Sequence, residues 1–262
     1  MSREKITVIV PTFNEERNIR ECLESARWAD ELLVVDSFSE DRTVELAGEL
    51  ADRVIQHEYV NSATQKNWAI PQAAHPWVMI LDADERVTPE LREEILALLS
   101  DPGGKDGFRV YRLNHFMGRP VRYCGWQHDD VLRVFRRDKS RYQDRAVHAD
   151  VIVEGDAVGV LKGKLIHNTF ESFDQYMKKF DRYTKWAATD RDKKTTRVGM
   201  SHLLLRPIAR FIRQYIIYQG FRDGLTGIIV CQLAAFSVFM KYARLWEMRR
   251  KKEIEEKSGE GK

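Results

Sequence analysis

The sequence has little of what marks secreted, zinc-binding or disordered proteins. It contains only three cysteines among 262 residues, Cys22, Cys124 and Cys231. No two of them have the spacing of zinc ligands, and an odd, scattered set suggests no disulfide framework, so a reducing compartment fits. No internal repeat or low-complexity tract is visible. With 43% hydrophobic and 32% charged residues, the chain has the composition of a globular protein.

Long apolar runs are also missing. The first apolar stretch ends after five residues at Pro11, which is too short for the core of a signal peptide, so we expect this part of the chain in the cytoplasm. Residues 225–240 carry no charge, but they number only 16. At about 1.5 Å per residue, a helix of this length reaches roughly 24 Å and falls short of the ~30 Å hydrocarbon core of a bilayer. A simple membrane-spanning helix is therefore not favoured.

Positive charge collects in the same part of the chain. The net charge is only +3, yet residues 199–252 hold ten Lys or Arg against two Asp or Glu. Arg206, Arg210 and Arg213 alternate with apolar and aromatic residues, and a proline and several glycines, Gly227 among them, are expected to break this segment into short helices. Helices lying in a membrane interface, with arginines reaching anionic headgroups, fit this pattern better than a spanning helix or a soluble subdomain. Because the charge is not set on a polar face, we expect no nucleic-acid partner.

The first hundred residues alternate between strand and helix patterns. Apolar periodicity at helical spacing separates four short apolar stretches, which we predict to be strands at residues 6–10, 32–35, 53–56 and 77–81. Strand–helix alternation with short connections predicts a parallel sheet with helices on both faces. Ligands of such sheets bind at the carboxyl ends of the strands, where Asp36 and Asp82 lie.

Asp82 and Asp84 follow the last of these strands and are separated by one alanine. Two acids so close together repel each other and are costly to bury unless a cation neutralises them. Mg²⁺ would serve, since it prefers one or two carboxylates together with substrate phosphates. On spacing alone, solvated acids that begin a turn are the favoured explanation of the pair, because two acids separated by one residue are common.

The pattern changes after residue 101. Short strands without intervening helices are predicted at residues 107–113, 131–135, 151–153 and 158–161. We interpret these strands as an antiparallel extension of the sheet. We expect it to cover the crevice at the carboxyl ends of the parallel strands and to receive a second substrate.

Four short motifs, taken in order, resemble the family 2 glycosyltransferases, which are inverting enzymes with the GT-A fold. The matching pieces are ITVIVPTFNE at residues 6–15, LVVDS at 33–37, QKNWA at 65–69 and DADE at 82–85. The resemblance implies an α/β fold, namely a GT-A, Rossmann-like, mostly parallel sheet with an antiparallel extension and a C-terminal helical membrane-associating segment. The implied parts are a catalytic domain (1–170, with a nucleotide-sugar half 1–101 and an acceptor half 102–170), an amphipathic and apolar helical region (171–252) and a flexible tail (253–262).

A closer likeness is to bacterial lipopolysaccharide inner-core glycosyltransferases, which act on a lipid-linked heptose acceptor. It rests on LRVFR at residues 132–136, VH at 147–148, LIH at 165–167 and GFRDG at 220–224. This resemblance implies an enzyme of cell-envelope and lipopolysaccharide biosynthesis with a lipid-linked saccharide acceptor. It would be a peripheral or monotopic protein on the cytoplasmic face of the inner membrane, bound to that anionic surface.

The resemblance also assigns roles to residues. The nucleotide-sugar-binding residues it implies are Pro11, Thr12, Asn14, Glu15, Asp36, Lys66, Asn67 and Asp82. Asp84 would bind Mg²⁺ or Mn²⁺ directly, and Asp82 the ribose or the metal. The ion offsets charge that builds on the departing nucleoside diphosphate. A UDP-sugar is the favoured donor, although the donor sugar, the linkage and the oligomeric state do not follow from the sequence.

The reaction further needs a base that takes the proton of the acceptor hydroxyl. In family 2 this is usually an Asp of an acidic pair before a Leu and an Arg, and HDDVLR at residues 128–133 matches. We favour Asp130 as the catalytic base. Asp129 is the neighbouring candidate, because only one of the two faces inward on a strand. A turn acid before the strand, without a catalytic role, is the alternative explanation. His148 is a candidate donor or metal contact, or a hydrogen-bonded structural histidine; His167 allows the same two interpretations.

Two other functions fit the sequence. A polyprenyl-phosphate sugar synthase would share the donor half but attack with a phosphate oxygen, so it would need no hydroxyl base. A non-catalytic, membrane-docked module that binds a nucleotide sugar would retain the fold without turnover.

Overall fold

The computed structural model describes residues 3–143, 150–192, 194–195 and 197–259. The chain divides into two compact units, which we call unit 1 (Met1–Leu113 and His128–Asn168) and unit 2 (Asn114–Gln127 and Thr169–Lys262). The sequence indicated a change of character near residue 170. It carried no sign that residues 114–127 pack with the C-terminal part of the chain.

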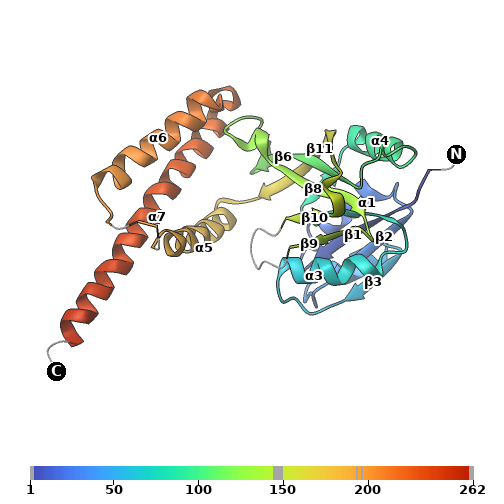
Figure 1. The fold of residues 1–262 in the computed structure, drawn as a ribbon, viewed down its shortest axis with the longest axis horizontal. Helices are drawn as coiled ribbons and strands as arrows, with labels where there is room; N and C mark the ends of the chain where they lie inside the picture. The colour runs from blue at the N-terminus through green and yellow to red at the C-terminus, as the bar shows by residue number, and fades with distance from the viewer. Residues whose placement is uncertain (1–2, 144–149, 193, 196, 260–262) are drawn as a thin grey trace. The chain divides into compact units, whose positions relative to one another are not determined.

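Alternating strands and helices form the first half of unit 1 (Figure 1). In chain order they are β1 (Ile6–Thr12), α1 (Ile19–Ala26), β2 (Glu31–Asp36), α2 (Thr43–Gly48), β3 (Arg53–Gln56), α3 (Ser62–Ala69) and β4 (Trp77–Ile80). The strands pair in parallel in the order β3-β2-β1-β4. Both faces of β2 and β4 are buried, which explains why their sequences are apolar without alternation. The predicted parallel sheet is confirmed.

Antiparallel strands continue this sheet beyond β4. They are β5 (Glu85–Val87), β6 (Gly107–Phe116), β7 (Arg119–Pro120), β8 (Asp130–Arg136) and β11 (Val158–Phe170), with helix α4 (Pro89–Leu98) between β5 and β6. The order continues as β8-β6-β11-β5, and β8 runs antiparallel to both β4 and β6. A separate hairpin pairs β9 (Ser140–Tyr142) with β10 (Val151–Val153). The predicted antiparallel extension is therefore present, although β5 was not predicted and β11 continues to Phe170 instead of ending at residue 161.

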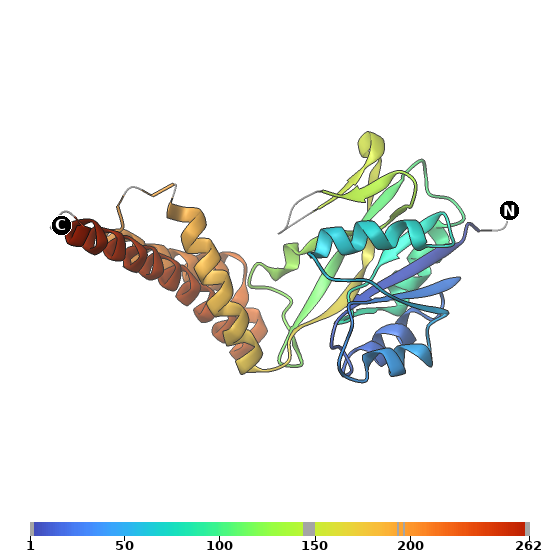
Figure 2. The ribbon, with the colours of Figure 1, turned by 90° about the horizontal axis from the view of Figure 1, so that it is seen from below.

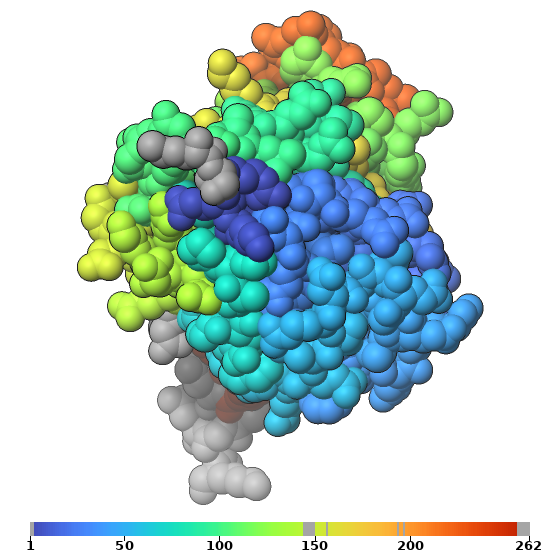
Figure 3. Space-filling view, turned by 90° about the vertical axis from the view of Figure 1, so that its right-hand side faces the viewer, coloured from blue at the N-terminus to red at the C-terminus, as the bar shows by residue number. Residues whose placement is uncertain are grey.

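Apolar cores lie on both faces of the sheet. One core joins it to α1 and α4 through side chains such as Leu23 and Ile95, and the other joins it to α3 and the β9–β10 hairpin through Ala69 and Tyr142. Figure 2 shows α3 on one face and α1 with α2 on the other. In the space-filling view, the described segments up to α3, coloured blue to cyan, form one continuous surface on the face shown (Figure 3). This layering leaves the carboxyl ends of the parallel strands as the edge at which loops gather.

Unit 2 is mainly helical. It contains α5 (Phe173–Asp192), a π-helical turn (Ser201–Leu205), α6 (Arg206–Ile212), a second π-helical turn (Arg213–Ile217), a 3₁₀ turn (Gly220–Asp223) and α7 (Gly224–Gly259). Both α5 and α6 pack against α7. The prediction that Gly227 breaks the helix is wrong, because α7 continues through it. A Cβ at Gly227 would stand 1.9 Å from the Gly220 carbonyl oxygen, so the glycine permits a close backbone approach.

Large apolar side chains of unit 2 are exposed along α6, the π-helical turns on either side of it, and α7. Examples are Leu205, Ile208, Ile212, Ile217 and Leu225. Within the described chain, one helical stretch, Gly220–Glu255, is long and apolar enough by length and composition to cross a membrane, and 22% of its most apolar window is buried. This helical stretch is therefore longer than the helix predicted from the 16 charge-free residues, 225–240.

Candidate active site

The loops after β1 and β2 are tied to each other at the carboxyl edge of the sheet. Thr12 and Asp36 end these strands side by side. Asn14, in the loop after β1, contacts the loop after β2. Its side-chain oxygen accepts the Glu40 N–H at 2.9 Å, and its backbone N–H donates to Ser39 Oγ at 2.8 Å. Asn14 adopts a left-handed backbone with φ of 54°, which asparagine tolerates better than most residues. Among the described side chains, Thr12 Oγ1 is one of a few buried polar atoms without a hydrogen-bond partner, so it is available to a ligand.

Asp36 organises the turn after β2. Its side chain is fully buried. One carboxylate oxygen accepts Gln56 Nε2 at 3.0 Å and the Ser39 N–H at 2.9 Å, and the other accepts the Ser39 hydroxyl. Two carboxylate oxygens offer about four lone-pair sites. The predicted contact of Asp36 with a base or ribose thus stays compatible with its structural role.

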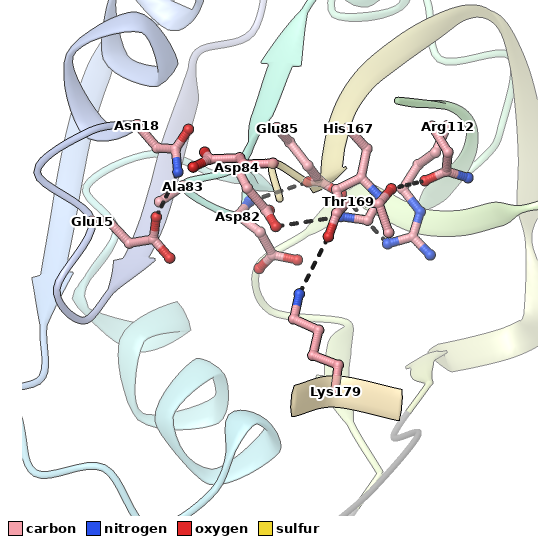
Figure 4. Close-up of polar contacts among 12 residues, drawn as sticks. Glu15, Asn18, Asp82, Ala83, Asp84, Glu85, Arg112, His167, Thr169 and Lys179 are labelled. Carbon is pink, nitrogen blue, oxygen red and sulfur yellow. Dashed lines mark hydrogen bonds and ion pairs between the residues drawn. The ribbon is translucent and has the colours of Figure 1, made fainter. Parts of the chain in front are cut away.

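The Asp82–Ala83–Asp84 turn is held from both sides. The Glu85 N–H donates to the Asp82 carbonyl at 2.8 Å, and the Asp82 N–H donates to Glu85 Oε2 at 3.1 Å. On the other side, the Asn168 N–H of β11 donates to the Asp84 carbonyl at 2.9 Å. Figure 4 shows Asp82, Asp84, Glu85 and His167 gathered at this turn.

Two cations neutralise Asp82. Lys66 Nζ on α3 lies 2.9 Å from Asp82 Oδ1, and Arg133 bonds Asp82 Oδ2 while also lying 2.6 Å from Glu85 Oε1. Burial alone would raise the pKa of Asp82, but the charges of Arg133 and Lys66 outweigh it and hold that pKa well below its usual range. The same pairing overcomes the effect of burial on Lys66 and Arg133 and raises the pKa of each. Protein side chains, rather than a metal ion alone, therefore balance the first acid of the motif.

A β-bulge directs Arg133 to this turn. Phe108 pairs with Val134 and Arg109 pairs with Leu132, which leaves Arg133 without a partner in the ladder. Bulges re-aim side chains in this way beside functional sites. Arg133 was not predicted from the sequence to be a site residue. One feature of the sequence does indicate a cation at this place. Residues 82–85 contain three carboxylates, which need a nearby cation if they are to be buried.

Asp84 faces a histidine from β11. His167 Nε2 lies 3.4 Å from Asp84 Oδ2, and His167 pairs with Glu85 across the antiparallel strands. Two ligands in neighbouring positions of an octahedral ion stand about 3 Å apart when each bond is about 2.1 Å, so this pair fits one cation. No described group of three or more His, Cys, Asp or Glu residues is placed to hold a metal. The protein would thus supply two ligands and the donor phosphates the others, and His148 lies outside the described residues.

The two acids at the start of β8 each form an ion pair with a different arginine. Arg112 donates to both carboxylate oxygens of Asp129, at 2.7 and 3.1 Å, and lies 3.7 Å from Glu85. Arg109 lies 2.9 Å from Asp130 and 2.8 Å from Asp150. Both acids are partly exposed, at 29% for Asp129 and 34% for Asp130. Each is thus oriented by an ion pair while part of its carboxylate reaches solvent.

The remaining predicted donor residues have local partners. The Asn67 amide donates to the Tyr142 carbonyl at 3.0 Å and accepts the Tyr142 N–H at 2.8 Å, so it joins α3 to β9. Glu15 accepts the Asn18 amide at 2.9 Å. Pro11 lies in β1 opposite Val35. The structure thus places these three residues near the carboxyl edge or on α3, and their contacts with a donor stay predictions.

The mixed sheet, with Asp36 and the Asp82–Asp84 turn at the carboxyl ends of β2 and β4, has the arrangement of nucleotide-sugar glycosyltransferases with a GT-A-like fold. The chain belongs to Glycosyl transferase family 2, whose sequence profile matches residues 7–149, more than half of its length.

Relatives extend the likeness over nearly the whole chain. The lipopolysaccharide core biosynthesis glycosyltransferase LpsC of Rhizobium meliloti is 28% identical over 253 residues, which cover 92% of each chain. An uncharacterized glycosyltransferase of Rickettsia typhi is 25% identical over 260 residues, 93% of this chain and 87% of that one. The crystal structure of glucosyl-3-phosphoglycerate synthase from Mycobacterium tuberculosis, in complex with Mn²⁺, UDP and glucosyl-3-phosphoglycerate, matches 66% of this chain and 75% of its own with a TM-score of 0.50 and 18% identity. That structural likeness shows the fold.

Proposed function

We propose that this glycosyltransferase moves a sugar from a UDP-sugar to a lipid-linked saccharide of the lipopolysaccharide core, with inversion at the anomeric carbon. The observation that carries the chemistry is the Asp82–Ala83–Asp84 turn, with Lys66 and Arg133 on its first acid and His167 beside its second. The likeness to LpsC over 92% of both chains supports the acceptor class.

Asp84 and His167 would hold Mg²⁺ or Mn²⁺ together with the donor diphosphate. When bound, the ion offsets negative charge on the departing nucleoside diphosphate. Asp82, kept ionised by Lys66 and Arg133, is available to accept a ribose hydroxyl. The presence of Mn²⁺ and UDP in the mycobacterial synthase supports this assignment.

Asp130 serves as the base. The acceptor hydroxyl attacks the anomeric carbon while its proton passes to a carboxylate oxygen of Asp130, which the ion pair with Arg109 orients. Asp129 is the neighbouring candidate, and its bidentate pairing with Arg112 leaves fewer free lone pairs for a proton. Asp130 is therefore favoured.

Unit 2 attaches the enzyme to the cytoplasmic face of the inner membrane. The exposed apolar side chains of α6 and α7 would enter the headgroup region, and the arginines among them would meet anionic lipid. Membrane attachment would bring the enzyme to the membrane that carries a lipid-linked acceptor.

A donor screen tests this function. The full chain is incubated with nucleotide sugars, Mn²⁺ or Mg²⁺ and core-truncated lipopolysaccharide, and nucleoside-diphosphate release is measured together with sugar transfer. We expect metal-dependent transfer from a UDP-sugar. Absence of release or transfer with every donor–acceptor pair would contradict the proposal.

The runner-up function is tested by changing the acceptor in the same assay. Polyprenyl phosphate attacks through a phosphate oxygen and needs no base at Asp130. Efficient transfer to polyprenyl phosphate that persists in Asp130→Asn would favour the polyprenyl-phosphate sugar synthase over the lipopolysaccharide enzyme.

A further inference from the structure

Unit 2 contains a cavity that the reaction does not use. It has a volume of about 290 Å³ and lies between α5 and α7. This is near the lower end of the roughly 300–1,000 Å³ typical of small-molecule sites. Aromatic and small side chains line it together with two lysines: Phe170, Tyr176, Lys179, Phe180, Tyr183, Thr184, Ala187, Ser237, Val238 and Lys241. No acid is among them.

The two lysines of this cavity have no carboxylate partner in the described part of the chain. Lys179 Nζ donates to the Thr169 carbonyl at 3.4 Å (Figure 4) and lies 5.2 Å from the Phe170 ring centre. Lys241 Nζ lies 4.8 Å from the centre of the Tyr242 ring. Both contacts satisfy an ammonium only in part, since a carbonyl and an aromatic face carry no net negative charge.

Other cations surround Lys241. Burial lowers the pKa of Lys241, and the positive charges of Arg191, Arg206 and Arg210 lower it further. Asp181 of α5 pairs with Arg244 of α7, but no ion pair in the described part of the chain joins an acid to Lys241 or to these three arginines. Positive charge thus accumulates around Lys241, as expected where an external anion completes the structure.

We infer that the cavity between α5 and α7 binds an anionic phospholipid, with its phosphate at Lys179 and Lys241 and the start of an acyl chain along Phe180 and Val238. Both lysines line the cavity without a carboxylate partner among the described residues, and the rest of the lining is largely apolar, so an anionic amphiphile suits the charge and the apolar surface together. A free phosphate would leave the apolar lining empty, and a zwitterionic lipid would return a positive charge to the lysines. The source of the lipid rests on the membrane attachment proposed above.

Calorimetric titration of the full chain tests this site. The ligands are dihexanoyl phosphatidylglycerol below its critical micelle concentration, dihexanoyl phosphatidylcholine with the same chains, and inorganic phosphate. We expect saturable binding of one phosphatidylglycerol, weaker binding of phosphatidylcholine, and no comparable binding of phosphate. Equal affinity for phosphatidylglycerol and phosphatidylcholine, or phosphate binding as tight as the lipid, would overturn the inference.

Substitutions of the lining residues test whether phosphatidylglycerol binds in this cavity. Lys179→Gln and Lys241→Gln should each weaken phosphatidylglycerol binding about tenfold, the loss expected for one charge-assisted hydrogen bond. Lys178→Gln, on the same helix but exposed and outside the cavity lining, is the matched control and should bind as the wild type does. Val238→Trp, which fills the cavity, should reduce binding of both lipids. Unchanged affinity in both lysine variants would overturn the inference even if Val238→Trp fails to fold.

Two further measurements separate this inference from the proposed function. UDP titration reports on unit 1, and sedimentation with phosphatidylglycerol vesicles reports on the exposed apolar surface of unit 2. A wild-type chain that binds vesicles and UDP but not the monomeric lipid overturns only the cavity inference. A chain that binds the monomeric lipid at Lys179 and Lys241 but neither vesicles nor UDP supports the cavity and contradicts the proposed function.

Discussion

Single side chains set the charge balance around the Asp82–Glu85 turn. Arg133 is almost fully buried, as is Glu85, and their ion pair exists because a bulge in β8 turns the arginine toward the acids. Removing one partner of a buried pair leaves the other charge unsolvated, which costs more than the pair itself contributes. Arg133 is therefore a positioning residue whose first effect is on stability.

Arg133→Met should lower the free energy of unfolding by about 3–5 kcal/mol, because buried Glu85 loses its nearest cation and, among its described ion partners, keeps only Arg112 at 3.7 Å. Urea denaturation followed by circular dichroism measures the change. Arg141→Met is the matched control: Arg141 is exposed on β9, and its loss should change stability by about 0.5 kcal/mol or less. Equal stability of the two variants would show that the Arg133 pairs do not hold the turn.

The acid pair at the start of β8 allows the base to be assigned by comparison. Asp130→Asn should lower kcat about 10²- to 10⁴-fold, the usual contribution of a general base, with little change in KM for the donor. Asp129→Asn should affect kcat less, since its loss disturbs Arg112 rather than the proton transfer. Steady-state kinetics with a fixed acceptor measure both. A larger kcat loss in Asp129→Asn would move the base to Asp129.

At the scale of the elements, two glycines allow segments of unit 2 to pack closely against one another. Gly227 of α7 approaches the Gly220 carbonyl so closely that no Cβ fits, and a Cβ at Gly220 would stand 2.7 Å from Cys231 Sγ and 2.9 Å from Cys124 Sγ. The Asp223 carboxylate between these glycines accepts the backbone N–H of Tyr123 at 2.8 Å. The GFRDG segment thus fastens residues 114–127 to α7.

Gly227→Ala should therefore destabilise unit 2 by several kcal/mol, because the clash is with backbone that cannot move aside. Thermal unfolding and limited proteolysis of α7 measure the effect. Gly199→Ala is the control, since a Cβ added there would meet no atom within 4 Å, and this variant should melt with the wild type. A Gly227→Ala variant that melts at the wild-type temperature would contradict the close approach.

The elements that the sequence predicted best are those whose pattern is local. The parallel strands are buried on both faces, so their apolar runs and terminal acids identified β1, β2 and β4 and the carboxyl edge of the site. Features that depend on distant partners were missed. The bulge at Arg133 arises from pairing with β6, the three residues of β5 from pairing with β11, and the contact of Asp84 with His167 from the return of β11 to the turn.

Helix length in unit 2 was misjudged for a related reason. A glycine is expected to break a helix when only its conformational freedom is considered. Gly227 instead lies inside α7, where close packing against Gly220 compensates for the weak helix propensity of glycine. Such a compensation depends on a backbone contact that no local pattern encodes.

At the scale of the whole molecule, the residues proposed for the chemistry and the surface proposed for membrane attachment belong to different units. Unit 1 holds all the described acids and cations assigned to the donor and the base, whereas the exposed apolar helices and the lysine-lined cavity belong to unit 2. This division suits the proposed function, with a water-soluble donor and an acceptor that is carried in a membrane. In that proposal, transfer depends on a divalent ion held by Asp84 and His167.

The measurement that tests this claim most directly is Mn²⁺ binding by electron paramagnetic resonance, in the presence of UDP, together with the rate of UDP release. We predict one Mn²⁺ per wild-type chain, and a parallel loss of Mn²⁺ affinity and of turnover, about tenfold or more, in Asp84→Asn and His167→Gln. His75→Gln, which precedes β4 at the amino edge of the sheet, should behave as the wild type. Wild-type Mn²⁺ affinity and turnover in both Asp84→Asn and His167→Gln would contradict a metal site at these two residues.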